Sequence, residues 1–330
     1  MDYVELQDIE RVAQYPIDWT LIDNKTIMIS GGTGFIGSFL SDVIRYRNKQ
    51  YKTSTKIISL SRRGSSSDGT VENLKADIVN QIKYEGEIDY ILHLASNTHP
   101  KQYGEDPVGT IITNVLGCDN LLRLAVEKKS KFFLASSVEI YGQGTKIPMD
   151  EKYSGYIDCN TARSGYNEAK RTCEALCQSY KQQYGVEVYI ARLSRVFGPD
   201  KKVDTKALSQ FMDKAVAKEN IILNSKGNQR FSYCYVADIA TGIFTLLTKG
   251  INGEVYNISE DDDGTTLGGY AEFIASLACV EVEYQIENNV AASKASFALL
   301  DTSKIKALGW NPMYSVKEGM ERTYNIKCSR

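Results

Sequence analysis

Residues 26–37 read Thr26-Ile27-Met28-Ile29-Ser30-Gly31-Gly32-Thr33-Gly34-Phe35-Ile36-Gly37, an apolar run followed by a glycine-rich turn. The apolar run predicts a strand, and Phe35 to Tyr46 predicts a helix that the glycines open. Gly31 allows a tight turn, Gly34 lets the backbone approach a pyrophosphate, and Gly37 lets the helix pack closely on the strand. This context favours a dinucleotide site over a glycine-rich turn that holds no ligand.

The same rhythm of apolar run, turn and amphipathic stretch continues to about residue 199. Helical patterns at 110–128 and 166–184 separate several of the apolar runs. Such an alternation predicts an α/β fold, a Rossmann-type doubly wound parallel sheet that helices cover on both faces. The further strands are expected at 56–60, 89–94, 131–134 and 186–191.

The regular alternation of apolar runs and amphipathic stretches ends after Phe197-Gly198-Pro199. This change indicates a second, smaller α/β lobe interleaved with the first domain. We expect residues 1–24 to form an N-terminal extension. The dinucleotide-binding domain is expected to comprise 25–199 and about 234–250. The C-terminal substrate-binding lobe is expected to comprise 200–233 and 251–330.

Composition narrows the class of protein. The chain has 330 residues, of which 42% are hydrophobic and 24% are charged, as in ordinary globular proteins. Its net charge is −2, so there is no overall positive charge that would favour binding to nucleic acid. No apolar run approaches the roughly 18 residues that span a bilayer, and the acidic N-terminus does not resemble a signal peptide. We therefore expect a cytoplasmic protein that binds neither nucleic acid nor membrane. The seven scattered cysteines and two histidines indicate reduced thiols and no metal site.

Tyr166 and Lys170 lie one helical turn apart and project from one face. An ammonium beside a phenol stabilises the phenolate and lowers a pKa that is normally about 10. A tyrosine tuned in this way can exchange a proton with a carbinol oxygen while a nicotinamide exchanges hydride with its carbon. The spacing alone is common, but behind a nucleotide loop it indicates a redox site.

Six motifs then occur in order, and together they resemble the extended short-chain dehydrogenase/reductases of the NAD-dependent epimerase/dehydratase type. The resemblance covers about residues 25–325 and leaves the first two dozen unexplained. The motifs are the glycine turn, His93-Leu94-Ala95-Ser96, Ser136-Ser137-Val138-Glu139-Ile140-Tyr141-Gly142, the Tyr166/Lys170 pair, Arg192 to Pro199, and Arg230 to Asp238.

The resemblance implies NAD(P) binding, a nucleotide-sugar substrate and a set of residue roles. Tyr166 would donate or accept the proton, Lys170 would lower its pKa and hold the ribose, and Ser137 would orient the substrate oxygen. Asn114 would support this catalytic site, and Arg230 would grip the substrate pyrophosphate. The implied cofactor contacts are Gly31, Thr33, Gly34, Phe35, Ile36, Gly37, Ser61, Arg62, Arg63, Asp77, Leu94, Ala95, Ser96, Tyr166 and Lys170.

Three local features refine these implications. The second strand ends in Ser61-Arg62-Arg63, without the acid that accepts from an adenosine 2′-hydroxyl, which favours NADP(H) over NAD(H) unless both arginines are only exposed. Glu139 stands where related 4,6-dehydratases and decarboxylases use a glutamate, although it could be a structural acid. Arg195 replaces an asparagine that many relatives use, which indicates extra positive charge near phosphates or a non-standard sugar.

These features favour net reduction of a keto group on a nucleotide-activated sugar, of the keto-sugar or CDP-linked ketose type, in synthesis of a surface polysaccharide precursor. The alternative is redox-neutral chemistry by a 4,6-dehydratase, decarboxylase or epimerase, with Glu139 assisting. A third possibility is a non-catalytic NADP-sensing protein, against which the intact Ser137, Tyr166 and Lys170 argue. Helices 110–128 and 166–184 resemble those that relatives pair between two subunits, so we expect a homodimer. Burial of these helices in the protein's own core would give similar apolar stripes along them.

Overall fold

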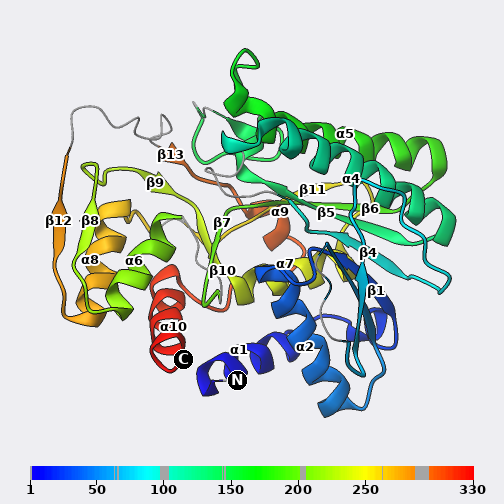
Figure 1. Ribbon diagram of the computed structural model, residues 1–330, viewed down its shortest axis with the longest axis horizontal. Coiled ribbons are helices and arrows are strands. Elements are labelled where there is room, and N and C mark those ends of the chain that lie inside the picture. Colours follow the sequence, from blue (N-terminus) through cyan, green and yellow to red (C-terminus); the bar gives the residue numbers. More distant parts are fainter. Residues whose placement is uncertain are drawn as a thin grey trace.

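The computed structural model describes residues 2–330 except 63, 65–66, 97–103, 143, 145, 201–205, 262 and 287–296. Helices and strands alternate through the first two thirds of this chain (Figure 1). The strands are β1 (Thr26–Ser30), β2 (Lys56–Ser61), β3 (Val71–Lys75), β4 (Tyr90–His93), β5 (Lys131–Ser137), β6 (Val188–Leu193), β7 (Arg195–Phe197), β8 (Ile221–Leu223), β9 (Arg230–Phe231), β10 (Tyr233–Tyr235), β11 (Val255–Ile258), β12 (Val282–Tyr284) and β13 (Phe297–Ala298). The α-helices are α1 (Tyr3–Ala13), α2 (Phe35–Tyr51), α4 (Pro107–Lys128), α5 (Gly165–Tyr184), α6 (Ala207–Val216), α7 (Val236–Lys249), α8 (Leu267–Ala278), α9 (Ser303–Lys306) and α10 (Val316–Cys328), and the 3₁₀ helices are η1 (Trp19–Leu21), η2 (Val138–Tyr141) and η3 (Ala162–Ser164).

Seven parallel strands form the main sheet, in the order β11-β6-β5-β4-β1-β2-β3. The chain runs outward from β1 through β2 to β3 and then returns to the other side of β1 with β4. In open α/β sheets such a reversal forms a crevice at the carboxyl ends of the two strands concerned, here β1 and β4, and ligands bind there. The predicted Rossmann-type doubly wound sheet is therefore present.

Each face of the sheet has its own apolar core, because successive side chains of a strand point to opposite faces. Met28 and Ile58 belong to the core that α4 and α5 cover, whereas Ile27, Ile29 and Ile57 belong to the core that includes α2 and α7. Figure 1 shows α4 and α5 side by side over one face. Burial on both faces explains why these strands read as continuous apolar runs in the sequence.

A smaller lobe lies beside the carboxyl ends of the strands (Figure 1). Three two-stranded parallel pairs, β7 with β10, β8 with β12 and β9 with β13, build it together with α6, α8 and α10. The lobe is α/β, as the sequence predicts.

Three elements differ from the sequence-based expectation. β3 was not predicted, because this edge strand is only partly buried and carries polar residues. β11 lies within residues 251–330, assigned to the lobe, yet it pairs with β6 as the edge strand of the main sheet. In the N-terminal extension, α1 packs against α2, α7 and α10, and buried Asp8 accepts hydrogen bonds from Tyr235 and Tyr314. The extension is therefore built into the fold.

Candidate active site

The glycine turn between β1 and α2 has the geometry of a dinucleotide cradle. Gly31 has φ 76°, its N–H donates to Leu60 O at 3.1 Å, and its carbonyl accepts from Gly34 N–H at 2.8 Å. A Cβ at Gly31 would lie 3.0 Å from Ala95 N, and one at Gly37 only 2.5 Å from Gly31 O. The turn can close this tightly only with glycine at both positions.

Helix α2 begins at Phe35 with Gly34 as its N-cap, and no side chain among the described residues caps it. Its first N–H groups therefore remain available, and the positive end of the helix dipole faces the crevice. Thr33 is exposed here, while Phe35 and Ile36 are half-buried. An uncapped helix start behind a glycine turn fits the diphosphate of a dinucleotide.

The expected adenosine contacts gather at the carboxyl ends of β2 and β3, which pair through Ser61 and Lys75. Ser61 Oγ accepts from Gly64 N–H at 3.0 Å, and half-buried Asp77 accepts from Val79 N–H at 3.2 Å. Arg62 is exposed at the end of β2. Arg63 lies outside the described residues.

The end of β4 borders the same crevice. Leu94 N–H donates to Ser30 O at 3.2 Å, and Ala95 N–H lies 3.3 Å from Ser30 Oγ. Ser96 Oγ donates to Asn114 Oδ1 at 2.9 Å, which links the strand end to helix α4. These contacts place Leu94, Ala95 and Ser96, the three expected cofactor contacts of this motif, together at the end of β4.

His93 lies beneath the crevice, fully buried, with Nδ1 2.8 Å from Ser30 Oγ. Burial, with the neighbouring Lys170 ammonium, lowers the pKa of His93 to about 3. The ring is therefore neutral at physiological pH and positions β4 rather than titrating.

Two hydrogen bonds bring the Tyr166/Lys170 helix to the end of β5. Lys170 Nζ donates to Ala135 O at 2.9 Å, and Asn167 Nδ2 donates to Glu139 O at 2.6 Å. Ser137 ends β5, and its Oγ accepts from Glu139 N–H at 3.2 Å. Tyr166 is buried at the start of α5, one turn before Lys170. The structure thus gathers the predicted catalytic residues at one strand end.

The Lys170 ammonium is buried, and burial lowers its pKa, while the neighbouring Cys173, Cys118 and Glu174 act in the opposite direction. Asn114 is also buried and contacts this helix, because its carbonyl accepts from Cys173 Sγ at 3.4 Å. Asn114 therefore connects Ser96 with the helix that carries Tyr166 and Lys170, and its supporting role in catalysis stays a prediction.

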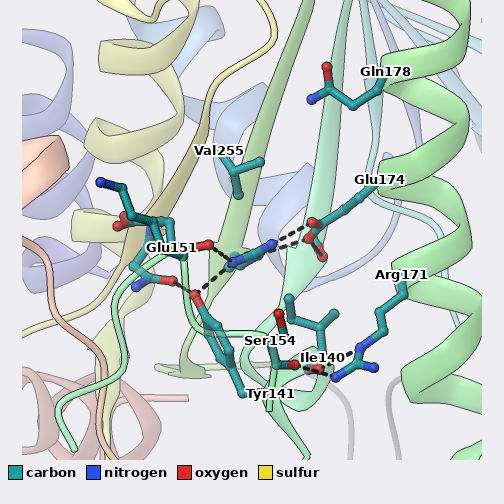
Figure 2. A network of polar contacts seen from close by, with 12 residues as sticks. Ile140, Tyr141, Glu151, Ser154, Arg171, Glu174, Gln178 and Val255 are labelled. Carbon is teal, nitrogen blue, oxygen red and sulfur yellow. Dashed lines mark hydrogen bonds and ion pairs between the residues drawn. The ribbon is translucent and has the colours of Figure 1, made fainter. Parts of the chain in front are cut away.

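A buried ionic network lies one helical turn further along α5. Arg192 donates to Glu174 through Nη2 at 2.7 Å and Nε at 3.1 Å, and Ser136 Oγ donates to Glu174 Oε1 at 2.5 Å. The Arg192 Nη1 group donates to Tyr141 OH at 3.0 Å and to Glu151 O at 2.9 Å. Figure 2 shows Glu174 and Tyr141 at two separate ends of this network. Sequence analysis missed the network, although Glu174 follows Lys170 by four residues on the same helix face.

A second, more open group of charges surrounds Glu139. Its Oε1 lies 3.7 Å from Arg195 Nη2, and its Oε2 lies 3.9 Å from Arg163 Nη2. The Arg195 guanidinium stacks 3.7 Å above the ring of Phe231. Arg230, the other expected substrate arginine, precedes Phe231 in β9 and is half-buried. Arg163 was not predicted, and no motif marks it.

A family model described as "NAD dependent epimerase/dehydratase family" matches residues 27–259. UDP-glucuronic acid decarboxylase 1 of Danio rerio is 31% identical over 306 residues, which cover 91% of this chain and 72% of that protein. UDP-glucuronic acid decarboxylase 3 of Arabidopsis thaliana is 32% identical over 318 residues, or 93% and 91% of the two chains. The chain belongs to the NAD-dependent epimerase/dehydratase family.

Solved structures share the fold of this family member. A UDP-glucose 4-epimerase from Thermotoga maritima, solved with UDP-glucose, superposes with a TM-score of 0.78 at 22% identity, covering 92% of this chain and 100% of that one. A dTDP-glucose 4,6-dehydratase from Bacillus anthracis in complex with NAD gives 0.74 at 22% identity, with coverage of 91% and 96%. Family and fold are thereby confirmed. The description of the family model gives NAD as the cofactor on which the family depends.

Helix α4 of this family member carries an exposed apolar stripe. Val108, Ile111, Ile112 and Leu116 are between 40% and 70% exposed, at helical spacing on the side away from the core. The stripe is consistent with the expected homodimer, which stays a prediction. Among the described residues, no helix is long and apolar enough to cross a membrane, and no group of three or more His, Cys, Asp or Glu side chains could hold a metal ion.

Proposed function

We propose that this protein binds an NAD(P) dinucleotide at the Gly31–Gly37 turn and modifies a nucleotide-linked sugar in a redox-neutral reaction. The observation that carries the proposal is the pair of hydrogen bonds from Lys170 to Ala135 and from Asn167 to Glu139. They hold the buried Tyr166 helix against the strand end that carries Ser137. This arrangement supports Tyr166 as the proton-transfer group and the Ser137 hydroxyl as the group that orients the substrate.

Each residue has a defined task in this proposal. Ser137 Oγ donates to the reacting sugar oxygen and fixes its position. Tyr166 takes the proton of that hydroxyl when the carbon is oxidised and returns it when the carbon is reduced. The Lys170 ammonium stabilises the phenolate form of Tyr166 between these steps. The nicotinamide, when bound, exchanges the hydride.

Glu139 supports a redox-neutral reaction over the net reduction that sequence analysis favoured. Its carboxylate lies between two guanidinium groups, and its N–H donates to Ser137 Oγ, which supports a role for Glu139 near the reacting carbon. A carboxylate there can accept a proton from a carbon next to a transient carbonyl or assist loss of a neighbouring group. The similar proteins named UDP-glucuronic acid decarboxylases support the same alternative and make UDP-sugars the first substrates to test.

The test follows the absorbance of reduced nicotinamide while UDP-glucuronate, UDP-glucose or UDP-N-acetylglucosamine is incubated with the protein and NAD(P). We expect product by mass spectrometry or NMR with no net absorbance change. Tyr166→Phe should lose several orders of magnitude in turnover while it retains cofactor affinity. Stoichiometric consumption of NADPH would contradict the proposal and favour the reductase.

Net reduction with NADPH is the second candidate, and exposed Arg62 at the end of β2 favours it. A guanidinium at this position can bind a 2′-phosphate. Such a reductase, or the redox-neutral enzyme, could supply precursors of a surface polysaccharide from the cytoplasm. We expect Arg62→Ala to lower the ratio of NADP to NAD affinity if this residue binds the phosphate. An unchanged ratio would remove the reason for preferring NADP.

A further inference from the structure

Arg195 occupies a fixed position at the carboxyl edge of the sheet. It begins β7, two residues after β6 ends, and its N–H donates to Ser232 O at 3.1 Å in the pairing with β10. Its guanidinium carbon lies 3.7 Å from the ring centre of buried Phe231. A planar cation stacked on an aromatic ring is held in orientation, so its edges point in defined directions.

One donor of this guanidinium has no acceptor among the residues that the structure describes. Nη1 is buried and has no hydrogen-bond partner in the part of the chain that the structure describes. Nη2 faces Glu139 Oε1 at 3.7 Å, which is longer than an N–H···O hydrogen bond of about 2.7–3.2 Å. Buried donors normally have acceptors, so an acceptor supplied by a ligand is the simplest completion. The side chain as a whole is 27% exposed, so Arg195 is not sealed from solvent although Nη1 is covered.

The charges around Arg195 favour an anion. Arg195 and Arg163 contribute two positive charges, and Glu139 between them contributes one negative charge. Because Nη2 faces Glu139, the Nη1 edge is the one left for another acceptor. A carboxylate or phosphate oxygen can accept a charge-assisted hydrogen bond from this group.

We propose that Arg195 forms an oxyanion subsite for a carboxylate on the sugar of the substrate, next to the carbon that reacts. The inference rests on the proposed function and narrows its substrate to acidic sugars. Arg195 is paired with Glu139, whose N–H binds the Ser137 hydroxyl, so the subsite adjoins the sugar ring. The substrate diphosphate would present the same oxyanion chemistry, and the experiment separates these two sources.

The experiment measures binding by calorimetry in the full chain carrying Tyr166→Phe, saturated with NAD so that no substrate is consumed. The probes are UDP, UDP-glucose and UDP-glucuronate, of which the last two differ only in the carboxylate. We expect at least a tenfold preference for UDP-glucuronate over UDP-glucose. Adding Arg195→Gln should reduce that preference below twofold and leave the affinity for UDP unchanged.

Arg163→Gln is the matched control, because it removes the other guanidinium beside Glu139 and is 57% exposed. It should change the preference less than threefold. An equal loss in both variants would overturn the subsite in favour of a general positive field. A uniform loss of UDP, UDP-glucose and UDP-glucuronate binding in Arg195→Gln would assign Arg195 to the diphosphate instead.

Two further outcomes separate this inference from the proposed function. Binding of UDP and both sugars without a preference for the carboxylate would overturn the subsite alone. Failure to bind any of the three probes would overturn the subsite together with the proposed action on UDP-sugars.

Discussion

Two glutamate–arginine pairs lie close to the candidate catalytic residues, and they differ in almost every physical respect. Glu174 and Arg192 approach to 2.7 Å, with side chains 12% and 11% exposed. Glu139 and Arg195 approach only to 3.7 Å and are 29% and 27% exposed. The two arginines are three residues apart, on either side of the junction between β6 and β7.

The difference lies in how completely each cation is satisfied. Arg192 makes two bonds to Glu174 and two more to Tyr141 and Glu151, so its buried charge is matched within the protein. Arg195 retains a buried donor that has no acceptor among the residues the structure describes. Burying a charge is costly unless it is paired and hydrogen-bonded, which makes the first pair part of the framework. In the second pair, Arg195 can still donate a hydrogen bond to a ligand. Its unsatisfied donor lowers the stability of the ligand-free protein.

The largest expected effect is on stability, from Arg192→Leu. This change leaves the Glu174 carboxylate buried beside α5 without its cation, and breaking such a pair costs about 3–5 kcal/mol. Urea titration followed by circular dichroism should show the loss as a lower unfolding midpoint. A change below about 1 kcal/mol, the range of an exposed ion pair, would remove the distinction between the two pairs.

The next effect is on catalysis, from Glu174→Gln. Glu174 binds Ser136, the neighbour of Ser137, and its charge raises the pKa of Lys170 against the effect of burial. Without that charge the Lys170 ammonium is lost at lower pH, so we expect the alkaline limb of the pH–rate profile to move to lower pH. Displacement of the strand end should lower kcat by up to about a hundredfold.

A merely structural Glu174 would lower the unfolding midpoint without moving the pH profile, and that result would contradict its positioning role. Gln178, one turn further along α5, provides a control, because it is exposed and donates to Gly253 O at 2.7 Å. Gln178→Ala should leave both the profile and kcat unchanged.

The sequence predicts the framework better than it predicts either pair. Continuous apolar runs and the glycine turn depend on local spacing, so the parallel sheet and the cradle at Gly31 can be derived from residue order alone. The Tyr166/Lys170 face follows from helical periodicity in the same way. Two strands could not be predicted in this way. Edge strand β3 has no continuous apolar run, and β11 joins the main sheet only after the chain has passed through the smaller lobe.

The two glutamate–arginine pairs form only through tertiary structure, which brings distant segments together. Glu174 and Arg192 are 18 residues apart on a helix and a strand, and nothing in their spacing reveals that the two meet. Arg195 is noticeable in the sequence only as a departure from the asparagine of many relatives. Its stacking on Phe231 and its distance from Glu139 arise from the pairing of β7 with β10, which no local pattern encodes.

The smallest expected effect is on the free energy of unfolding, from Arg195→Met in the absence of ligand. This variant distinguishes the Glu139–Arg195 pair most directly from the Glu174–Arg192 pair. The change loses a weak pair with Glu139, worth about 0–1 kcal/mol, and a stack on Phe231 worth about 0.5–1 kcal/mol. It also removes a buried donor without an acceptor, which costs the folded state about 1–3 kcal/mol. These contributions oppose one another, so the free energy of unfolding should change by less than about 1 kcal/mol in either direction. Urea titration beside Arg192→Leu measures this directly, and a loss as large as that of Arg192→Leu would mean that both arginines belong to the framework.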